Sequence, residues 1–233
     1  MTWDGVERRK PIAIGVMCKA PRPGVSKTRL AQTTGADMAA RLAGAFIRDV
    51  FHTISTAQLL SPIVPFAFYA PANARSEISA LVPPTTRLHL QEGTDLGIVM
   101  FDALQAMLAV CPAGAVLIGS DIPTLPSEIL LQAMSSLRMH GERVVFGPSF
   151  DGGYYLIGIK TASAAPLFAP MAWSGPLVME ETRSRARLHG LQQVDVEPWY
   201  DVDDAVGLVK LKATLAVTAV DVAPATRAVL ASV

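Results

Sequence analysis

Four cationic side chains lie close together near the amino end of the sequence: Lys19, Arg22, Lys27 and Arg29. They follow an apolar run over residues 11–18, which predicts a short buried strand. Two prolines and Gly24 lie among them and interrupt regular helix and strand, so we expect a turn of fixed shape. Arginine binds phosphate oxygens through a bidentate fork, and lysine adds a point charge. In a sequence whose formal net charge is zero, this placement after a strand favours a phosphate-binding loop over an ordinary solvated basic loop.

The piece from Gly24 to Thr28 resembles the end of a P-loop but lacks its glycines. A P-loop needs Gly directly before the Lys and a second Gly five residues earlier, and these places hold Ser26 and Pro21. Pro21 has no backbone N–H and cannot take the left-handed conformations open to Gly, so the usual nest of amides would not form. The sequence therefore speaks against a P-loop NTPase.

Later aspartates are candidates for a metal site that would face these cations. Asp121 directly follows an apolar run over residues 115–119, where a carboxylate is well placed to hold Mg²⁺ or Mn²⁺ together with phosphate oxygens. A turn or cap role is the alternative. Alternation places Asp201 and Asp203 on the same side of an extended segment, so both could face one cation. Capping of the following helix by Asp203 or Asp204 remains open.

Residues 151–153 (Asp-Gly-Gly) form a second polar segment between two apolar runs. They resemble a hairpin turn, because Gly supplies the positive φ that such turns need. Alternatively, Gly152 and Gly153 admit a ligand close to the backbone, with Asp151 or Tyr154 touching it. Spacing alone leaves these two interpretations equal.

Residues 91–97 form a third polar segment, a loop that leads into a predicted helix. Gly93 and Gly97 allow close approach to the backbone, and the start of the helix could receive an anion or a base edge. A plain strand–helix connection is the more economical interpretation.

Short apolar runs alternate with amphipathic stretches along the rest of the sequence. Strands are predicted over residues 11–18, 63–69, 86–91, 115–119, 144–147 and 154–159. Helices are predicted from a capping box at Thr34–Asp37 through Ile54, over 74–81 and 97–110, from a cap at Ser127 to 139, over 176–188 and 204–219, and after Pro224. This order predicts an α/β sandwich with a mostly parallel sheet, whose ligands gather beyond the carboxyl ends of the strands. We expect one domain over residues 1–233, with its core at about 11–210 and a short helical C-terminal tail.

Composition excludes several classes of protein. Apolar residues make up 51% of the 233 residues and aromatic residues 6%, which is typical of a globular protein. Balanced charge argues against a nucleic-acid partner or a membrane-surface role. Cys18 and Cys111 lack C-x-x-C spacing and are expected to be buried thiols. The basic residues 8–10 imitate a signal peptide, but no small-residue cleavage site follows, and no apolar segment reaches membrane-spanning length. We expect a cytoplasmic protein without a membrane span.

Six motifs occur in a fixed order: Lys19-x-Pro-x-Pro-Gly-x-x-Lys-Thr-Arg-Leu30, Gln91-x-Gly-x-Asp-Leu-Gly97, Gly119-Ser-Asp-Ile-Pro123, Asp151-Gly-Gly-Tyr-Tyr-Leu-Ile-Gly158, Trp173-Ser174 and Asp201-Val-Asp203. With them, the sequence resembles the GT-A-like transferases of the nucleotide-diphospho-sugar transferase superfamily. Relatives of that group include the phospholactate and molybdenum-cofactor guanylyltransferases. The matches spread over roughly residues 11–210, and the combination is specific although each piece alone is not.

The resemblance implies a three-layer α/β/α, Rossmann-like GT-A fold whose first loop contacts nucleotide phosphates. It places Asp121 at the superfamily's metal-binding aspartate and Asp203 as the second carboxylate, with Mg²⁺ or Mn²⁺ as cofactor. Lys27 and Asp121 are the candidate catalytic residues. Nucleotide or phosphate binding is expected at Lys19, Arg22, Gly24, Lys27, Arg29, Gln91, Gly93 and Asp95, and acceptor or sugar binding at Asp151, Gly152, Gly153, Tyr154 and Trp173.

Departures from the family pattern fall mainly outside the first loop. Ile98 and Val99 stand where relatives carry Glu-Arg, and Ser174-Gly175 replaces Ser-Thr. The last motif continues as Asp-Ala-Val-Gly-Leu208 rather than Thr-Pro-Glu-Asp-Leu. The first loop and both candidate metal carboxylates remain.

The high positive charge of the first loop favours a triphosphate donor. We therefore expect nucleotidyl transfer from a nucleoside triphosphate to a small phosphorylated acceptor. Glycosyl transfer from a nucleotide-sugar and a non-catalytic nucleotide-binding module are the alternatives.

Overall fold

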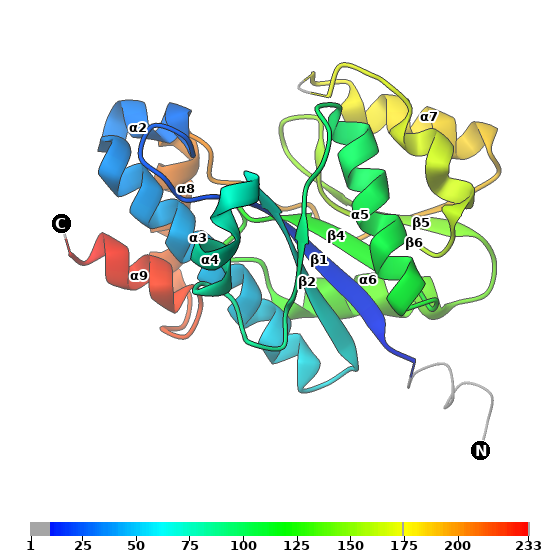
Figure 1. Cartoon of the computed structure of the whole chain (residues 1–233), viewed down its shortest axis with the longest axis horizontal. Helices are drawn as coiled ribbons and strands as arrows, with labels where there is room; N and C mark the ends of the chain where they lie inside the picture. Colours follow the sequence, from blue (N-terminus) through cyan, green and yellow to red (C-terminus); the bar gives the residue numbers. More distant parts are fainter. Residues whose placement is uncertain (1–9, 174, 233) are drawn as a thin grey trace.

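The computed structural model of the chain describes residues 10–173 and 175–232. Its centre is a seven-stranded sheet with helices on both faces (Figure 1). The strands of the described part are β1 (Ile12–Lys19), β2 (Ile63–Ala70), β3 (Arg87–Leu90), β4 (Ala115–Gly119), β5 (Arg143–Pro148), β6 (Tyr154–Ile159) and β7 (Gln192–Asp195). Their spatial order is β3-β2-β1-β4-β6-β5-β7.

The sheet is mixed but mostly parallel, as predicted. Strands β3, β2, β1 and β4 run parallel to one another, β6 runs antiparallel to both β4 and β5, and β7 is parallel to β5. In β1, Lys19 pairs with Ala70 of β2, and Met17 pairs with Gly119 of β4. The carboxyl ends of these parallel strands therefore meet at one edge of the sheet, which is where ligands bind in open α/β sheets.

The helices are α2 (Thr28–Thr34), α3 (Ala36–Gln58), α4 (Arg75–Ser79), α5 (Leu96–Val110), α6 (Ser127–Arg138), α7 (Val178–Leu188), α8 (Ala205–Val217) and α9 (Pro224–Leu230). Two 3₁₀ segments, η1 (Ala72–Ala74) and η2 (Ala162–Phe168), complete the described elements. Helix α9 packs beside α3 (Figure 1). Among the described helices, none combines the length and apolarity that a membrane span requires.

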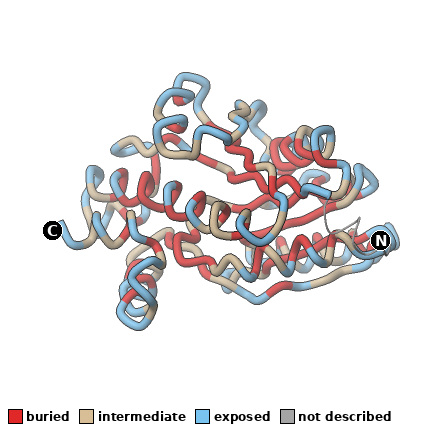
Figure 2. Tube along the Cα trace, turned by 90° about the horizontal axis from the view of Figure 1, so that it is seen from below, coloured by how far each residue is buried: buried red, intermediate tan, exposed pale blue. Residues whose placement is uncertain are grey.

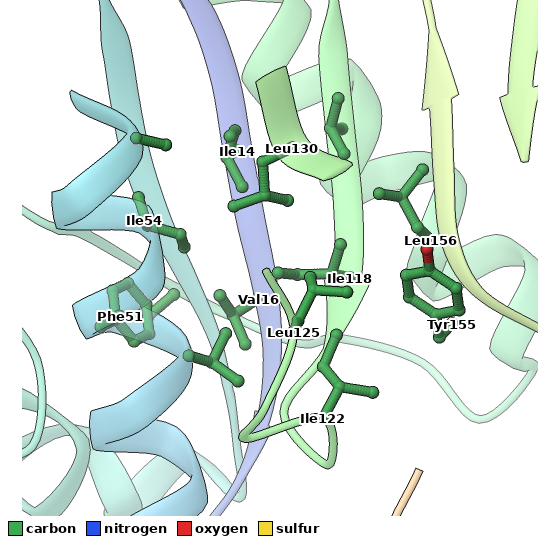
Figure 3. Close-up of a cluster of buried hydrophobic side chains, with 14 of the residues drawn as sticks. Ile14, Val16, Phe51, Ile54, Ile118, Ile122, Leu125, Leu130, Tyr155 and Leu156 are labelled. Atoms are coloured by element: carbon green, nitrogen blue, oxygen red, sulfur yellow. The ribbon is translucent and has the colours of Figure 1, made fainter. Parts of the chain in front are cut away.

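Alternation along β1 builds a core on each face of the sheet. Ile12, Ile14 and Val16 point to one face, where α3 and α6 pack, whereas Ala13 points to the other, beneath α5, η2 and α7. Figure 3 shows the first of these clusters, in which side chains of α3, β1, β4 and β6 face one another. Full burial of one such aliphatic side chain stabilises the fold by about 1.5–3 kcal/mol. Figure 2 shows buried residues running through the interior of the molecule and exposed residues on its outer turns.

A third apolar cluster brings the C-terminal segment to the start of the chain. Tyr200 and Val202 are buried against Phe46 of α3 and Leu30 of α2. The backbone N–H of Val202 also donates to the carbonyl oxygen of Asp121 at 2.8 Å. Residues near position 200 are thereby fixed against both α3 and the loop after β4.

Two predicted helix caps are wrong. Thr34 is the last residue of α2, and its hydroxyl donates to the carbonyl of Leu30 rather than capping α3. Gly35, with φ of 84°, occupies the cap position and separates the two helices, because glycine tolerates this conformation. At α6, Pro126 takes the cap position and Ser127 is already helical.

Three further elements were not predicted: α2, η2 and β7. The segment 192–195 is short and has only one apolar residue, and it forms a strand because it pairs with the edge of β5. The expected turn in the first loop ends at Lys27, so Arg29 belongs to a helix. Cys18 and Cys111 are both buried, as expected.

Candidate functional site

A cavity of about 520 Å³ opens at the edge of the sheet where β1, β2 and β4 end. Six residues that the sequence proposed for binding line it: Lys19, Lys27, Arg29, Gln91, Asp121 and Asp203. They come from four separate segments, and Lys27 and Asp203 are 176 positions apart in the chain. The fold thus brings the cations of the first loop to the two candidate metal carboxylates.

Lys27 lies at the centre of this cluster. Its Nζ is 2.7 Å from Oδ2 of Asp121 and 2.5 Å from Oδ1 of Asp203, and its side chain is only 6% exposed. Burial opposes the charged ammonium, but the two carboxylates outweigh it, so the pKa of Lys27 lies above its ordinary value. The ammonium is also 5.9 Å from the ring centre of Phe46. The site therefore holds a buried, permanently charged lysine between two acids.

The backbone of Lys27 is itself unusual. Its φ of 53° and ψ of 44° lie in the left-handed region, which is uncommon for a residue with a Cβ and costs about 1–2 kcal/mol. This conformation directly precedes α2. Strain of this kind persists where the surrounding structure fixes it, and it is found most often at functional sites.

Asp203 has both oxygens engaged. Arg29 binds Oδ2 at 2.7 Å while Lys27 binds Oδ1. Burial raises the pKa of the Asp203 carboxyl, but the two adjacent cations outweigh it, and the pKa lies below its ordinary value. Capping of α8 falls to Asp204, which accepts from the N–H of Gly207 at 2.9 Å. The alternative that the sequence left open is thus resolved: Asp204 caps the helix and Asp203 faces the cavity.

Asp201 does not line this cavity, although alternation placed it beside Asp203. Burial raises the pKa of its carboxyl, and the negative charges of Asp203 and Asp151 raise it further. Asp201 is therefore a half-buried acid near Asp203 that does not line the cavity.

The donor set fits a divalent cation held jointly with a ligand. Asp121 and Asp203 direct oxygens to one common point, which the Lys27 ammonium occupies. Carboxylate oxygens are the hard ligands that Mg²⁺ and Mn²⁺ prefer, usually one or two of them beside phosphate oxygens and water. Within residues 10–173 and 175–232, no group of three or more His, Cys, Asp or Glu side chains forms a metal site. A cation at this point would therefore depend on phosphate oxygens.

Gln91 is fixed at the end of β3. Its Nε2 donates to the carbonyls of Cys18 at 3.2 Å and Phe68 at 2.6 Å, and its backbone N–H donates to Tyr69 at 2.9 Å. The side chain thus bridges β1 and β2 at the rim of the cavity.

Four proposed nucleotide ligands lie outside the lining of this cavity: Arg22, Gly24, Gly93 and Asp95. Arg22 instead forms an ion pair with Glu77 of α4 at 2.5 Å and donates to Asn73 at 3.0 Å. Asp95 caps α5 by accepting from the N–H of Ile98 at 3.0 Å. Arg22 thus fastens the first loop to α4, and Asp95 has a structural role.

The five proposed acceptor residues also lie outside this lining: Asp151, Gly152, Gly153, Tyr154 and Trp173. Residues 151–153 form the turn between β5 and β6, in which Asp151 accepts from the hydroxyl of Ser149 and the N–H of Gly153. Gly152 has φ of 93°, and a Cβ there would lie 2.1 Å from the Pro176 carbonyl oxygen. The hairpin interpretation of this segment is therefore confirmed.

Tyr154 and Trp173 pack into the core cluster beneath α5. The Tyr154 hydroxyl and the Trp173 indole nitrogen are buried without a hydrogen-bond partner among the described residues. Trp173 lies against Gly97, where a Cβ would come within 2.3 Å of its ring. Ser174 of the same motif lies outside the described residues.

Sequence reasoning missed several lining residues. Ser26, Thr28 and Ser120 bring hydroxyl-bearing side chains to the cavity, and Ser120 donates to Asp121 at 3.1 Å. Each of these three residues directly precedes a charged residue that the sequence did identify, and this position next to it could have indicated them. Met17 and Leu96 add apolar surface that no motif marked.

Comparison with solved structures places this geometry among known transferase folds. The chain is 30% identical to a "putative nucleotide-diphospho-sugar transferase" from Desulfovibrio desulfuricans G20, with 95% of this chain and 94% of that chain covered and a TM-score of 0.84. It shares its fold with 4-diphosphocytidyl-2C-methyl-D-erythritol synthase from Anaerococcus prevotii DSM 20548, at 10% identity, 89% and 99% coverage and a TM-score of 0.58. It also shares the fold of CMP:2-keto-3-deoxy-manno-octonic acid synthetase complexed with CTP, at 10% identity, 88% and 98% coverage and a TM-score of 0.55.

No curated protein matches the sequence. Residues 53–175, more than half of the chain, match the family described as "Uncharacterized protein conserved in bacteria (DUF2064)". The resemblance to nucleotide-diphospho-sugar transferases is confirmed by the structural match. This chain belongs to the DUF2064 family and has the fold shared by nucleotide-sugar transferases and cytidylyltransferases.

Proposed function

We propose that the protein transfers a nucleotidyl group from a nucleoside triphosphate to a small phosphorylated acceptor. The observation that carries this proposal is the ammonium of Lys27, held between Asp121 and Asp203 in the cavity. Lys19 and Arg29 line the same cavity, so its phosphate-binding charge is concentrated at the end of β1. A fold neighbour complexed with CTP supports a nucleotide ligand of this kind.

In the proposed reaction, an oxygen of the acceptor phosphate forms a bond to the α-phosphorus. The bond from the α-phosphorus to the bridging oxygen breaks, and pyrophosphate leaves with the electron pair. Lys19, Lys27 and Arg29 bind the β- and γ-phosphates and stabilise the negative charge that develops on the leaving group. In this proposal Lys27 moves from the carboxylates to the phosphates, so that its ammonium has anionic partners in both positions.

Asp121 and Asp203 would then hold Mg²⁺ or Mn²⁺, which when bound supplies neutralisation of phosphate charge. Asp121 is oriented by the hydroxyl of Ser120 and by its backbone bond to Val202. Acceptor contacts at Asp151 and its neighbours remain a prediction of the family resemblance. The charge of Asp151 raises the pKa of the Asp201 carboxyl, so these two side chains lie near each other.

Glycosyl transfer is the second candidate, favoured by the name of the 30% identical relative. The two reactions release different products from the same site. The protein is incubated with Mg²⁺, each nucleoside triphosphate and a pool of phosphorylated metabolites, and then with nucleotide-sugars. Pyrophosphate release supports nucleotidyl transfer, and nucleoside diphosphate release supports glycosyl transfer. Tight nucleotide binding without either product leaves a non-catalytic binding module.

The variant Asp121→Asn tests the proposed role of this carboxylate in metal binding. It is expected to abolish metal-dependent nucleotide binding while the protein remains folded, because Asp121 is at the rim of a cavity and not in the core. Asp195→Asn removes the carboxylate of an ion pair of equal length (2.7 Å) to Arg183, outside this cavity, and serves as control. Collapse of the fold in the first variant alone would show that Asp121 is structural.

A further inference from the structure

A second cavity, of about 710 Å³, lies between α3, α9 and the first loop. It shares no lining residue with the cavity at the sheet edge. Ala225 and Val229 of α9 form one side of it, and Pro21 and Pro23 come from the first loop. Figure 1 shows α9 beside α3. Mostly apolar cavities of roughly 300–1,000 Å³ are the usual sites of small molecules.

Gly44 keeps the middle of this cavity open. It lies inside α3, where glycine is the least favourable residue after proline. Packing does not require a glycine there, because a Cβ would lie 3.7 Å from Pro21 and 3.9 Å from Leu81, at ordinary contact distances. Both neighbours line the cavity, so a side chain at position 44 would fill part of it. Gly44 therefore enlarges the cavity at a cost in helix propensity.

The walls of the cavity are held by contacts outside it. Asp49 of α3 is buried and accepts from the N–H groups of Ala225 at 2.9 Å and Thr226 at 2.8 Å, which fastens the start of α9 to α3. Arg22, which stands between the two prolines of the first loop, is paired with Glu77. The cavity is thus formed before a ligand enters it, and a ligand need not order its walls.

One end of the cavity is cationic. Arg48 lines it and also lines a neighbouring hollow of about 330 Å³, to which His52 belongs. These two residues are four positions apart, so they share one face of α3. Among the described residues, none forms a hydrogen bond or ion pair with the side chain of Arg48, whereas Arg41 donates to Ser232 at 2.6 Å. Asp37, the acid in the lining, lies roughly 16 Å from Arg48 along the helix.

We propose that this cavity binds a small molecule with an apolar body and one anionic head group. The body lies against Gly44, Pro21 and the apolar side chains of α9, and the head group lies between Arg48 and His52. Arginine binds a carboxylate or a phosphate through two parallel N–H donors, so either head group fits. The ligand touches the loop that carries Lys27 from outside the cavity at the sheet edge. This inference does not depend on the transfer reaction proposed above.

The test uses octyl phosphate, octanoate and octanol, each titrated into the whole protein by calorimetry. At least one octyl anion is expected to bind at a single site, about tenfold or more tightly than octanol, which has the same apolar body without the charge. Comparison of the two anions shows which head group the site prefers. Arg48→Met should lower the affinity for the preferred anion by about tenfold or more and leave that for octanol unchanged. Gly44→Leu fills the cavity and should weaken the binding of both.

Arg187→Met is the control variant, because Arg187 is an exposed residue of α7 that lines neither cavity. Lys27→Met, in the cavity at the sheet edge, should likewise leave binding of the octyl anions unchanged. Absence of saturable binding at millimolar concentrations, equal binding of octanol and both anions, or full affinity in Arg48→Met would overturn the inference. A loss in Lys27→Met without a loss in Arg48→Met would place the anion among the proposed phosphate ligands. That result would overturn this inference and leave the proposed function standing.

Discussion

Replacing Lys27 by Met is expected to move the affinities for nucleotide and for divalent cation in opposite directions. The ammonium now occupies the point to which Asp121 and Asp203 direct their oxygens, at 2.7 and 2.5 Å. A cation that arrives without nucleotide must displace it into a pocket already lined by Lys19 and Arg29. A nucleoside triphosphate supplies phosphates that receive Lys27, and so it frees the carboxylates.

The magnitude follows from the contacts. Two unit charges about 4 Å apart attract by about 4 kcal/mol at an effective dielectric constant near 20. Desolvation of the ammonium offsets most of this attraction, and a charge-assisted hydrogen bond is worth about 1.5–3 kcal/mol net. Without the Lys27 ammonium, which competes with the metal for the two carboxylates, the affinity for Mn²⁺ in the absence of nucleotide should rise by about 10- to 100-fold, since 1.4 kcal/mol is a factor of ten. The affinity for nucleotide should fall by about 1–3 kcal/mol, because a phosphate ligand is lost.

Mn²⁺ binding is measured by electron paramagnetic resonance of the free ion, and nucleotide binding by calorimetry without metal. Lys160→Met is the control, since the Nζ of Lys160 donates to the Met139 and Gly141 carbonyls and the residue does not line this cavity. If Lys27→Met weakened the binding of both Mn²⁺ and nucleotide, or left Mn²⁺ binding unchanged, the proposed exchange of the ammonium for a metal would be wrong.

Four further predictions concern stability and the first loop. Asp203 has a lowered pKa, so its charge stabilises the fold above the ordinary value near 3.9 and this is lost as the pH falls through the lower folded value. In Asp203→Asn, the free energy of unfolding measured with urea should therefore fall less on acidification than in the wild type. The difference should be at most about 1 kcal/mol, because the side chain is 31% exposed. Gly97→Ala should lower the free energy of unfolding by about 1–3 kcal/mol, since its Cβ would lie 2.3 Å from a carbonyl oxygen and an indole ring. Gly44→Ala, whose Cβ would meet its neighbours at 3.7 Å, should raise it by about 0.5–1 kcal/mol in the same measurement. Arg22→Met and Glu77→Met should both leave nucleotide affinity unchanged in calorimetry, because their side chains pair with each other; a loss in the first equal to that of Lys27→Met would return Arg22 to the phosphate site.

The convergence of Lys27, Asp121 and Asp203 follows from rules that the sequence contains. Lys27 and Asp121 follow apolar runs that became parallel strands, and the carboxyl ends of such strands share an edge. Asp203 could be assigned to the site because its position matches a family motif. Spacing alone did not decide whether Asp203 caps a helix or binds a metal. The structure assigns the cap to Asp204.

Other features depend on tertiary contacts that no local pattern encodes. The pairing of Arg22 with Glu77 depends on where α4 lies, 55 positions further along the chain. The four residues of β7, three of them polar, form a strand only because β5 offers an edge. The cap at Thr34 failed because Gly35, with its positive φ, provides a sharper break than a capping side chain.

The attachment of Val202 to Asp121 has a consequence for the order in which the protein matures. Domains generally fold as units during synthesis, so a residue contributes to a domain only after it has been made. Until residues 199–203 leave the ribosome, the nascent chain lacks Asp203, and Lys27 has a single acidic partner. Nucleotide capture in the proposed manner would therefore begin only after residue 203 has been synthesised, and stalled chains that end before residue 200 should emerge with an incomplete charge cluster.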